Sequence, residues 1–114
     1  MISKKTLEKL MQYITDIHET TEEKTVKQHP TELELLLSCL ACLQEETGEI
    51  ASEIRKMTGL SFNPQKVASF SPEALEEEIV DVLIVLLLLT KRVWTKSLDA
   101  AINKKIEKNN ARGY

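Results

Sequence analysis

Carboxylate side chains are the residues of this sequence best suited to chemistry. Asp81 lies inside the apolar run Ile79–Leu89, and Glu78 precedes it by almost one helical turn. A helix that is apolar on every side leaves Asp81 no side that faces solvent. Because an uncompensated buried charge is costly, we expect Asp81 to meet a cation, a metal ion or a hydrogen-bond donor.

A second acidic group lies earlier in the chain at helical spacing: Glu45, Glu46, Glu49 and Glu53. These residues fall in the C-terminal half of an expected helix, where the helix dipole disfavours negative charge. Carboxylates from two facing helices would repel one another and raise their own pKa values unless a cation were present. Oxygen ligands without imidazole or thiolate suit Mg²⁺ or Mn²⁺. The residues therefore favour a divalent cation between two helices, with a solvated acidic face as the alternative.

A basic line lies near the end of the sequence, where Lys105, Asn109 and Arg112 share one side of an expected helix. The helix dipole alone favours basic residues in a final turn. A metal ion that faces fixed cations, however, is typical of phosphate chemistry. The residue types leave open which phosphate ester is the substrate and which bond is cut.

Four helices are expected to position these groups. Capping signals and apolar periodicity place them at about residues 3–18, 31–57, 71 to 92 or 94, and 97–111. Thr31 and Glu34 form a capping box at the start of the second helix. Ser71 and Pro72 begin the third, and Gly59 follows the end of the second. Gly and Pro are scarce while Leu, Ile, Glu and Lys are abundant, so we predict an all-α fold.

The order of apolar and charged segments indicates how the helices pack. One face of the second expected helix begins apolar and ends acidic, whereas the corresponding face of the third begins acidic and ends apolar. Antiparallel packing would join the acidic ends, and an up-down-up-down arrangement would bring the basic line to the same place. We therefore expect an antiparallel four-helix bundle as the protomer. Residues 58–70 form a loop long enough to lie over the site.

Length and charge limit the classes of protein. With 114 residues the chain is expected to form a single domain, residues 1–114. Its net charge of −3 gives no overall attraction to nucleic acid or to anionic membranes. The apolar run is shorter than the roughly 20 residues that span a bilayer, and the N-terminus lacks the apolar core of a signal peptide. We expect a cytoplasmic protein that binds neither nucleic acid nor membrane.

The cysteines and aromatic residues are interpreted as packing groups. Cys39 and Cys42 form a CxxC pattern, but they lie in a Leu-rich helical segment without the strand and turn of a redox motif. We therefore expect core thiols rather than a redox or zinc site. The same packing role is expected for four aromatic residues: Tyr13, Phe62, Phe70 and Trp94.

Three short motifs occur in order between about Pro30 and the C-terminus. Glu45–Glu49 reads as EExxE, Glu78–Asp81 reads as ExxD, and Lys105–Arg112 reads as KxxxNxxR. Each motif alone is weakly specific, but the three together on three expected helices are fairly specific. In these motifs the chain resembles the MazG-like all-α nucleoside triphosphate pyrophosphohydrolases, which are relatives of the all-α dUTPases.

The resemblance implies hydrolysis of a nucleoside triphosphate to the monophosphate and pyrophosphate, with Mg²⁺ as the cofactor and Mn²⁺ as the alternative. The implied metal ligands are Glu46, Glu49, Glu78 and Asp81. The implied phosphate-binding residues are Lys105, Asn109 and Arg112. Glu45 is the candidate for orienting or deprotonating the attacking water, and Glu53 competes for that role. Such an enzyme would clean or regulate the nucleotide pool, with deoxynucleotides as the expected substrates.

An assembly and two competing functions are also expected. The segment Ile79–Leu89 has more apolar surface than one small bundle covers, so we expect a homodimer or a homotetramer. The family that the chain resembles is also oligomeric, with active sites near subunit contacts. The first alternative function is a non-catalytic helical oligomerisation or interaction module with a solvated acidic face. The second is a structural metal-binding bundle.

Overall fold

Helices make up the regular secondary structure of the chain. The structure, a computed structural model, describes residues 1–93 and 97–114. In these ranges the helices are α1 (Lys4–Glu19), α2 (Thr21–Lys24), α3 (Glu32–Met57), α4 (Pro64–Ala68), α5 (Pro72–Val93) and α6 (Asp99–Ala111). No strand occurs in them, so the predicted all-α class is confirmed. None of the helices within these ranges has the length and apolar character needed to cross a membrane.

Side-chain caps fix where the long helices begin. The Thr31 hydroxyl accepts a hydrogen bond from the Glu34 N–H at 3.2 Å, and the Glu34 carboxylate accepts one from the Thr31 N–H at 2.8 Å. This reciprocal pair is the capping box predicted for α3. At the start of α5, the Ser71 hydroxyl accepts a hydrogen bond from the Ala74 N–H at 3.0 Å. The predicted starts of both helices are therefore confirmed.

The end of α3 is closed by a Schellman motif. Gly59 adopts a φ of +70°, a left-handed conformation that glycine tolerates better than other residues. Its N–H donates to the Lys56 carbonyl at 3.2 Å, and the Leu60 N–H donates to the Arg55 carbonyl at 3.1 Å. The chain therefore turns sharply after α3 and enters α4, a short helix inside the segment predicted as a loop.

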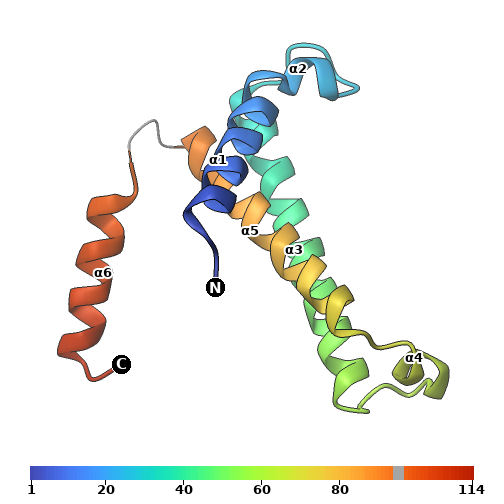
Figure 1. The fold of residues 1–114 in the computed structure, drawn as a ribbon. Coiled ribbons are helices and arrows are strands. Elements are labelled where there is room, and N and C mark those ends of the chain that lie inside the picture. The colour runs from blue at the N-terminus through green and yellow to red at the C-terminus, as the bar shows by residue number, and fades with distance from the viewer. Residues whose placement is uncertain (94–96) are drawn as a thin grey trace.

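Helix α5 lies between α1 and α3 (Figure 1). It runs antiparallel to α3, as predicted, because Arg92 near the end of α5 contacts Cys39 in the first half of α3. Farther along the pair, Asp81 of α5 lies beside Glu46 of α3. Among the described residues, α1 packs on α5 and not on α3. The α3–α5 pair is therefore the part of the fold that positions the acidic residues.

Helix α5 is less buried than its sequence suggests. None of its side chains is fully buried, and Ile79 and Val80 are about half exposed. Of the described helices, α1 and α3 are the ones that pack on α5, and they leave part of its surface exposed. The expectation that Asp81 has no access to solvent is therefore wrong for the single chain, in which Asp81 is exposed.

Helix α6 stands apart from the other helices (Figure 1). It packs against none of them in the described part of the chain, so the predicted four-helix protomer is not found. Its apolar stripe consists of Leu98, Ile102 and Ile106, all substantially exposed. A narrow stripe on a charged helix marks a packing face but does not select the surface that covers it. That residues 1–114 form a single domain stays a prediction.

Few side chains are fully enclosed within one chain. Among the described residues, Ile14 and Cys39 are the buried apolar side chains. Cys39 and the half-buried Cys42 are free thiols, in agreement with the expected core role. The expected packing role is wrong for Phe62, whose side chain is 98% exposed. Trp94 lies outside the described residues.

Arg92 joins three segments of the chain near the end of α5. Its guanidinium donates from Nη1 to the Leu35 carbonyl at 3.3 Å and to the Cys39 Sγ at 2.8 Å. From Nη2 it donates to the Thr21 hydroxyl at 3.0 Å. The charged donor therefore ties α2 to α5 and adds hydrogen bonds to the packing of α3 on α5.

Replacing Arg92 by Ala is expected to lower the free energy of unfolding by about 2–3 kcal/mol, because hydrogen bonds from a charged donor are lost. Urea-induced unfolding followed by circular dichroism measures the change. Lys91→Ala is the matched control, since Lys91 is an exposed neighbour on the same helix, and its effect should stay within about 0.5 kcal/mol. Equal effects of the two substitutions would contradict the role given to Arg92.

Candidate metal centre

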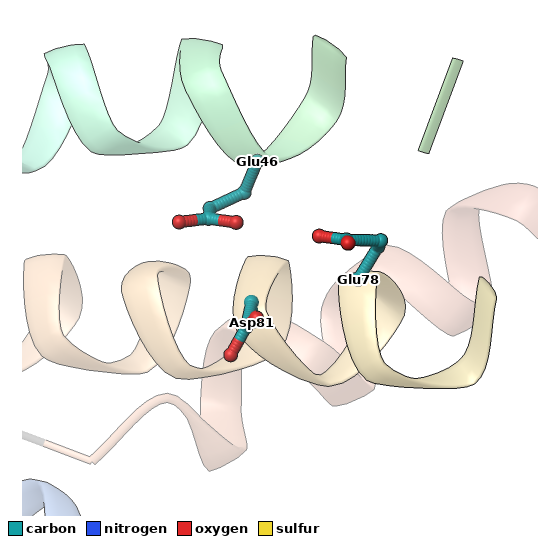
Figure 2. A group of neighbouring side chains, drawn as sticks. All are labelled: Glu46, Glu78 and Asp81. Carbon is teal, nitrogen blue, oxygen red and sulfur yellow. The ribbon is translucent and has the colours of Figure 1, made fainter. Parts of the chain in front are cut away.

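Three carboxylates from two helices meet within the α3–α5 pair. Glu46 comes from α3, while Glu78 and Asp81 come from α5. Each offers one oxygen, and these three oxygens all lie within 4.8 Å of one another. Figure 2 shows the Glu46 side chain extending from α3 towards Glu78 and Asp81. We call these three residues the acidic group. Antiparallel packing thus joins one residue of the EExxE motif to both acidic residues of the ExxD motif.

The acidic group fits the ligand requirements of Mg²⁺. This ion binds oxygen at about 2.1 Å, so two of its ligands lie at most about 4.2 Å apart. The limit of 4.8 Å within the acidic group is only slightly larger, and small side-chain rotations would close it. Glu46 and Glu78 are half-buried and Asp81 is exposed, so ions and phosphates can reach the group from solvent. Carboxylates without imidazole or thiolate partners suit Mg²⁺ or Mn²⁺ better than zinc.

The acidic group is electrostatically unfavourable without a cation. Burial raises the pKa of Glu46 above its ordinary value, and the charge of Asp81 raises it further. Burial likewise raises the pKa of Glu78, followed by repulsion from the neighbouring carboxylates, Glu49 first among them. Both shifts mean that negative charge is disfavoured at this place in the metal-free protein. A divalent cation would offset the repulsion.

Glu49 and Glu45 border the acidic group. Both are exposed on α3, and neither belongs to the three carboxylates whose oxygens converge. The charge of Glu49 raises the pKa of both Glu46 and Glu78. The charge of Glu45 acts on Glu46 in the same way. Glu49 is therefore beside the group rather than inside it.

Glu53 is the other expected catalytic residue, and its side chain is buried, with 6% of the residue exposed. Its Oε1 accepts a hydrogen bond from the Lys56 ammonium, while its Oε2 has no partner among the described atoms. Its charge contributes to the raised pKa of Glu78. The sequence did not indicate the ion pair of Lys56 with Glu53, because Glu and Lys three residues apart are common on helices.

The basic line is not joined to the acidic group within one chain. Lys105 and Arg112 are exposed and Asn109 is half-buried, all on α6 or directly after it. Because α6 packs against none of the other described helices, the fold of one chain does not bring these residues to the acidic group. In the described part of one chain, the three motifs are therefore only partly assembled.

Replacing Asp81 by Asn is expected to raise the Tm of the metal-free protein by a few degrees at neutral pH. The substitution removes a charge that repels both Glu46 and Glu78. Raised pKa values in the folded state contribute stability that is present below the ordinary value of 4.5 and is lost as the pH rises through the raised values. The gain in Tm should therefore shrink as the pH falls towards 4.5, because Glu46 and Glu78, with raised pKa values, take up protons on the way.

Thermal melts in a chelating buffer at about pH 7 and pH 5 measure this effect. Asp16→Asn is the control, because Asp16 is exposed on α1 and its Oδ1 accepts a hydrogen bond from Gln12 that an Asn oxygen can also accept. Its Tm should follow that of the wild type. A lower Tm for metal-free Asp81→Asn would contradict the packed-carboxylate arrangement.

A family comparison covers the part of the chain that holds the acidic residues. The model of the MazG nucleotide pyrophosphohydrolase domain matches residues 35–113, which is more than half of the chain. The matched part contains the acidic group and the basic line, whereas α1 and α2 precede it. No match was found among curated proteins or among solved structures. The chain belongs to the family of MazG nucleotide pyrophosphohydrolase domains.

Proposed function

We propose that the protein is a Mg²⁺-dependent nucleoside triphosphate pyrophosphohydrolase that releases a monophosphate and pyrophosphate. The observation that carries the proposal is the convergence of the acidic group from two separate motifs. Family membership supports the reaction class. Mn²⁺ is the alternative cofactor, since it takes the same oxygen ligands.

The acidic group would hold the cation, with Glu49 placed to join it. A bound divalent cation would acidify a water molecule and offset negative charge on the phosphates. Glu45, exposed beside Glu46, would orient the attacking water or take its proton. Glu53 is the competing base, but its ion pair with Lys56 occupies one of its oxygens.

The extent of exposed surface supports a homodimer or a homotetramer. The chain exposes 9074 Å², whereas a compact monomer of its mass exposes about 6,300 Å². Its radius of gyration is 17.3 Å, compared with about 13 Å for a compact domain of this length. The excess of roughly 2,800 Å² per chain amounts to about 5,600 Å² for two chains, at the upper end of the total area that obligate homodimers bury. We therefore propose that the folded unit contains at least two chains.

The surface of α5 beside the acidic group is suited to α6 of a partner subunit. Asp81 lines an open hollow of about 500 Å³ together with Glu73, Glu76, Glu77 and Val80. Helix α6 and Arg112 carry four basic residues against two acidic ones, next to an exposed apolar stripe. Both the charge and the apolar stripe complement this hollow. We propose that α6 of the partner subunit supplies Lys105, Asn109 and Arg112 for binding the phosphates.

A pyrophosphate-release screen with Mg²⁺ tests the proposed reaction. It covers the standard ribonucleoside and deoxynucleoside triphosphates and several damaged ones, and phosphorus NMR identifies the products. We expect monophosphate and pyrophosphate, with deoxynucleotides preferred, as a cytoplasmic enzyme that cleans or regulates the nucleotide pool would require.

Two other outcomes would redirect the proposed function. Turnover of no nucleotide would favour a non-catalytic interaction module with a solvated acidic face. Stabilisation by Mg²⁺ with no further rise of the Tm on adding any nucleotide would favour a structural metal site.

A further inference from the structure

A second candidate site lies at the end of α3, outside the acidic group. A cavity of about 320 Å³ opens between the last turns of α3 and the segment that leads into α4. Two serines and five larger side chains line it: Ser52, Ser61, Arg55, Lys56, Phe62, Asn63 and Lys66. We call it the basic pocket after its three cations, Arg55, Lys56 and Lys66. No acidic side chain of the described residues lines the pocket.

Local backbone structure gathers these side chains around one cavity. The Schellman motif at Gly59 turns the chain after α3. Asn63 then caps α4, since its Oδ1 accepts a hydrogen bond from the Gln65 N–H at 3.0 Å. The two turns bring Phe62 and Lys66 to the same cavity as Arg55. The pocket is therefore a product of the α3–α4 connection and not of chance surface charge.

The charge of the basic pocket suits an anionic ligand. Lys56 is paired with Glu53, so its charge is already balanced in part. Arg55 and Lys66 add two exposed cations at the same cavity. Guanidinium and ammonium groups form charge-assisted hydrogen bonds with phosphate oxygens. A phosphate group could use both without displacing Lys56 from Glu53.

The exposed ring of Phe62 indicates what else the ligand contains. The ring lines the pocket although the residue is 98% exposed, so it contributes little to the core of this chain. An aromatic face beside cations is a common platform for stacking a nucleobase. The cavity volume is at the lower end of the range for small-molecule sites, which favours a small ligand over a protein segment.

We propose that the basic pocket binds a nucleotide, with a phosphate group held by Arg55 and Lys66 and the base stacked on Phe62. The choice of a nucleotide among phosphorylated ligands rests on the proposed function. Helix α3 carries residues of both sites, since Glu46 of the acidic group and Arg55 and Lys56 of the pocket all lie on it. The nucleotide is thus either the substrate, reaching from the acidic group, or a second molecule bound beside it.

Titration calorimetry tests the pocket without requiring turnover. The probes are dATP and dTTP analogues with a methylene bridge between the α- and β-phosphates, added with Mg²⁺. Phe62→Leu removes the ring but keeps an apolar side chain, and a double variant, Arg55→Gln with Lys66→Gln, removes two charges. We expect each variant to bind the probes about tenfold more weakly or worse.

A matched control removes the same charge elsewhere. Lys5→Gln with Lys9→Gln takes two exposed cations from α1, which does not line the pocket, and its affinity should equal that of the wild type. Because Phe62, Arg55 and Lys66 are all exposed, the pocket variants should keep the wild-type Tm and circular dichroism spectrum. A loss of binding in these variants therefore reports on the pocket and not on folding.

The outcomes separate the pocket from the proposed reaction. Unchanged affinity in both pocket variants, or no binding by the wild type, would overturn the pocket even if the wild type hydrolyses nucleotides. If the pocket variants bind the probes more weakly but the wild type hydrolyses no nucleotide, the result would support the pocket and contradict the proposed function. If the wild type binds one nucleotide per protomer and the pocket variants have a raised KM, the nucleotide in the pocket is the substrate. If the wild type binds two nucleotides per protomer, and the variants lose one of them with KM unchanged, the nucleotide in the pocket is a second molecule.

Discussion

Replacing Asp81 by Asn is expected to lower kcat for pyrophosphate release by at least about 100-fold. The substitution keeps the size of the side chain but removes one charged oxygen of the acidic group, whose oxygens lie within 4.8 Å of one another. The two remaining carboxylates would bind a cation more weakly and would no longer fix its position. Glu46→Gln should have the same effect from the opposite helix.

Steady-state kinetics with Mg²⁺ raised to saturation measure this loss. Saturation matters because higher Mg²⁺ compensates for weaker binding but not for a misplaced cation. Asp16→Asn makes the same chemical change on α1, far along the sequence from the acidic group, and should keep kcat within about threefold of the wild type. Full activity of Asp81→Asn at saturating Mg²⁺ would show that Asp81 has no part in the reaction.

Mixing two inactive variants is expected to restore about a quarter of the wild-type activity, if each active site takes α6 from the partner subunit of a dimer. One variant is Asp81→Asn, and the other combines Lys105→Ala with Arg112→Ala. Each alone should lose at least about 100-fold in kcat, through the metal centre and through lost phosphate contacts respectively. In a mixed dimer, one site would join intact carboxylates to an intact basic line.

Subunit exchange is a necessary control for this experiment. The variants carry different affinity tags, and the mixed dimer is isolated after denaturation and joint refolding. One of its two sites is intact, so the isolated mixed dimer should show about half of the wild-type activity, against about a quarter for the unseparated mixture. Mixed dimers that contain both tags but show no recovered activity would mean that each chain supplies its own α6. Recovery in the mixture of untreated, non-exchanging proteins would instead point to contamination, so that sample must stay inactive.

Local signals predicted the helices of this chain well because each acts over only a few residues. The capping box of Thr31 and Glu34 and the cap at Ser71 fix the starts of α3 and α5. The same signals set the length of each helix and of the turn between them. Antiparallel packing then follows, and it brings Glu46 to Glu78 and Asp81 as the alternation of apolar and acidic segments predicted.

The position of α6 could not be predicted in the same way. Its apolar stripe of Leu98, Ile102 and Ile106 indicates that one side packs on something. It carries no information on whether that surface belongs to the same chain. The exposed state of Asp81 could not be predicted for the same reason, because the apolar residues of α5 do not indicate which surfaces cover them.

Interactions between distant segments were missed for a different reason. Arg92 donates hydrogen bonds to Thr21 on α2 and to Cys39 on α3, and neither its residue type nor its position in the sequence indicates those partners. The basic pocket likewise depends on the turn at Gly59, which returns Phe62 to the side of Arg55. Phe62 follows a loop glycine and precedes Asn-Pro, and that context could have indicated an exposed ring rather than packing.

Titration of the metal-free protein with Mn²⁺, followed by electron paramagnetic resonance without nucleotide, tests most directly whether the acidic group holds a divalent cation. We predict one site per protomer in the wild type and in Asp16→Asn, and binding at least about tenfold weaker in Glu46→Gln and Asp81→Asn. Equal Mn²⁺ affinity in all four proteins, or no binding by the wild type, would contradict a metal centre formed by α3 and α5.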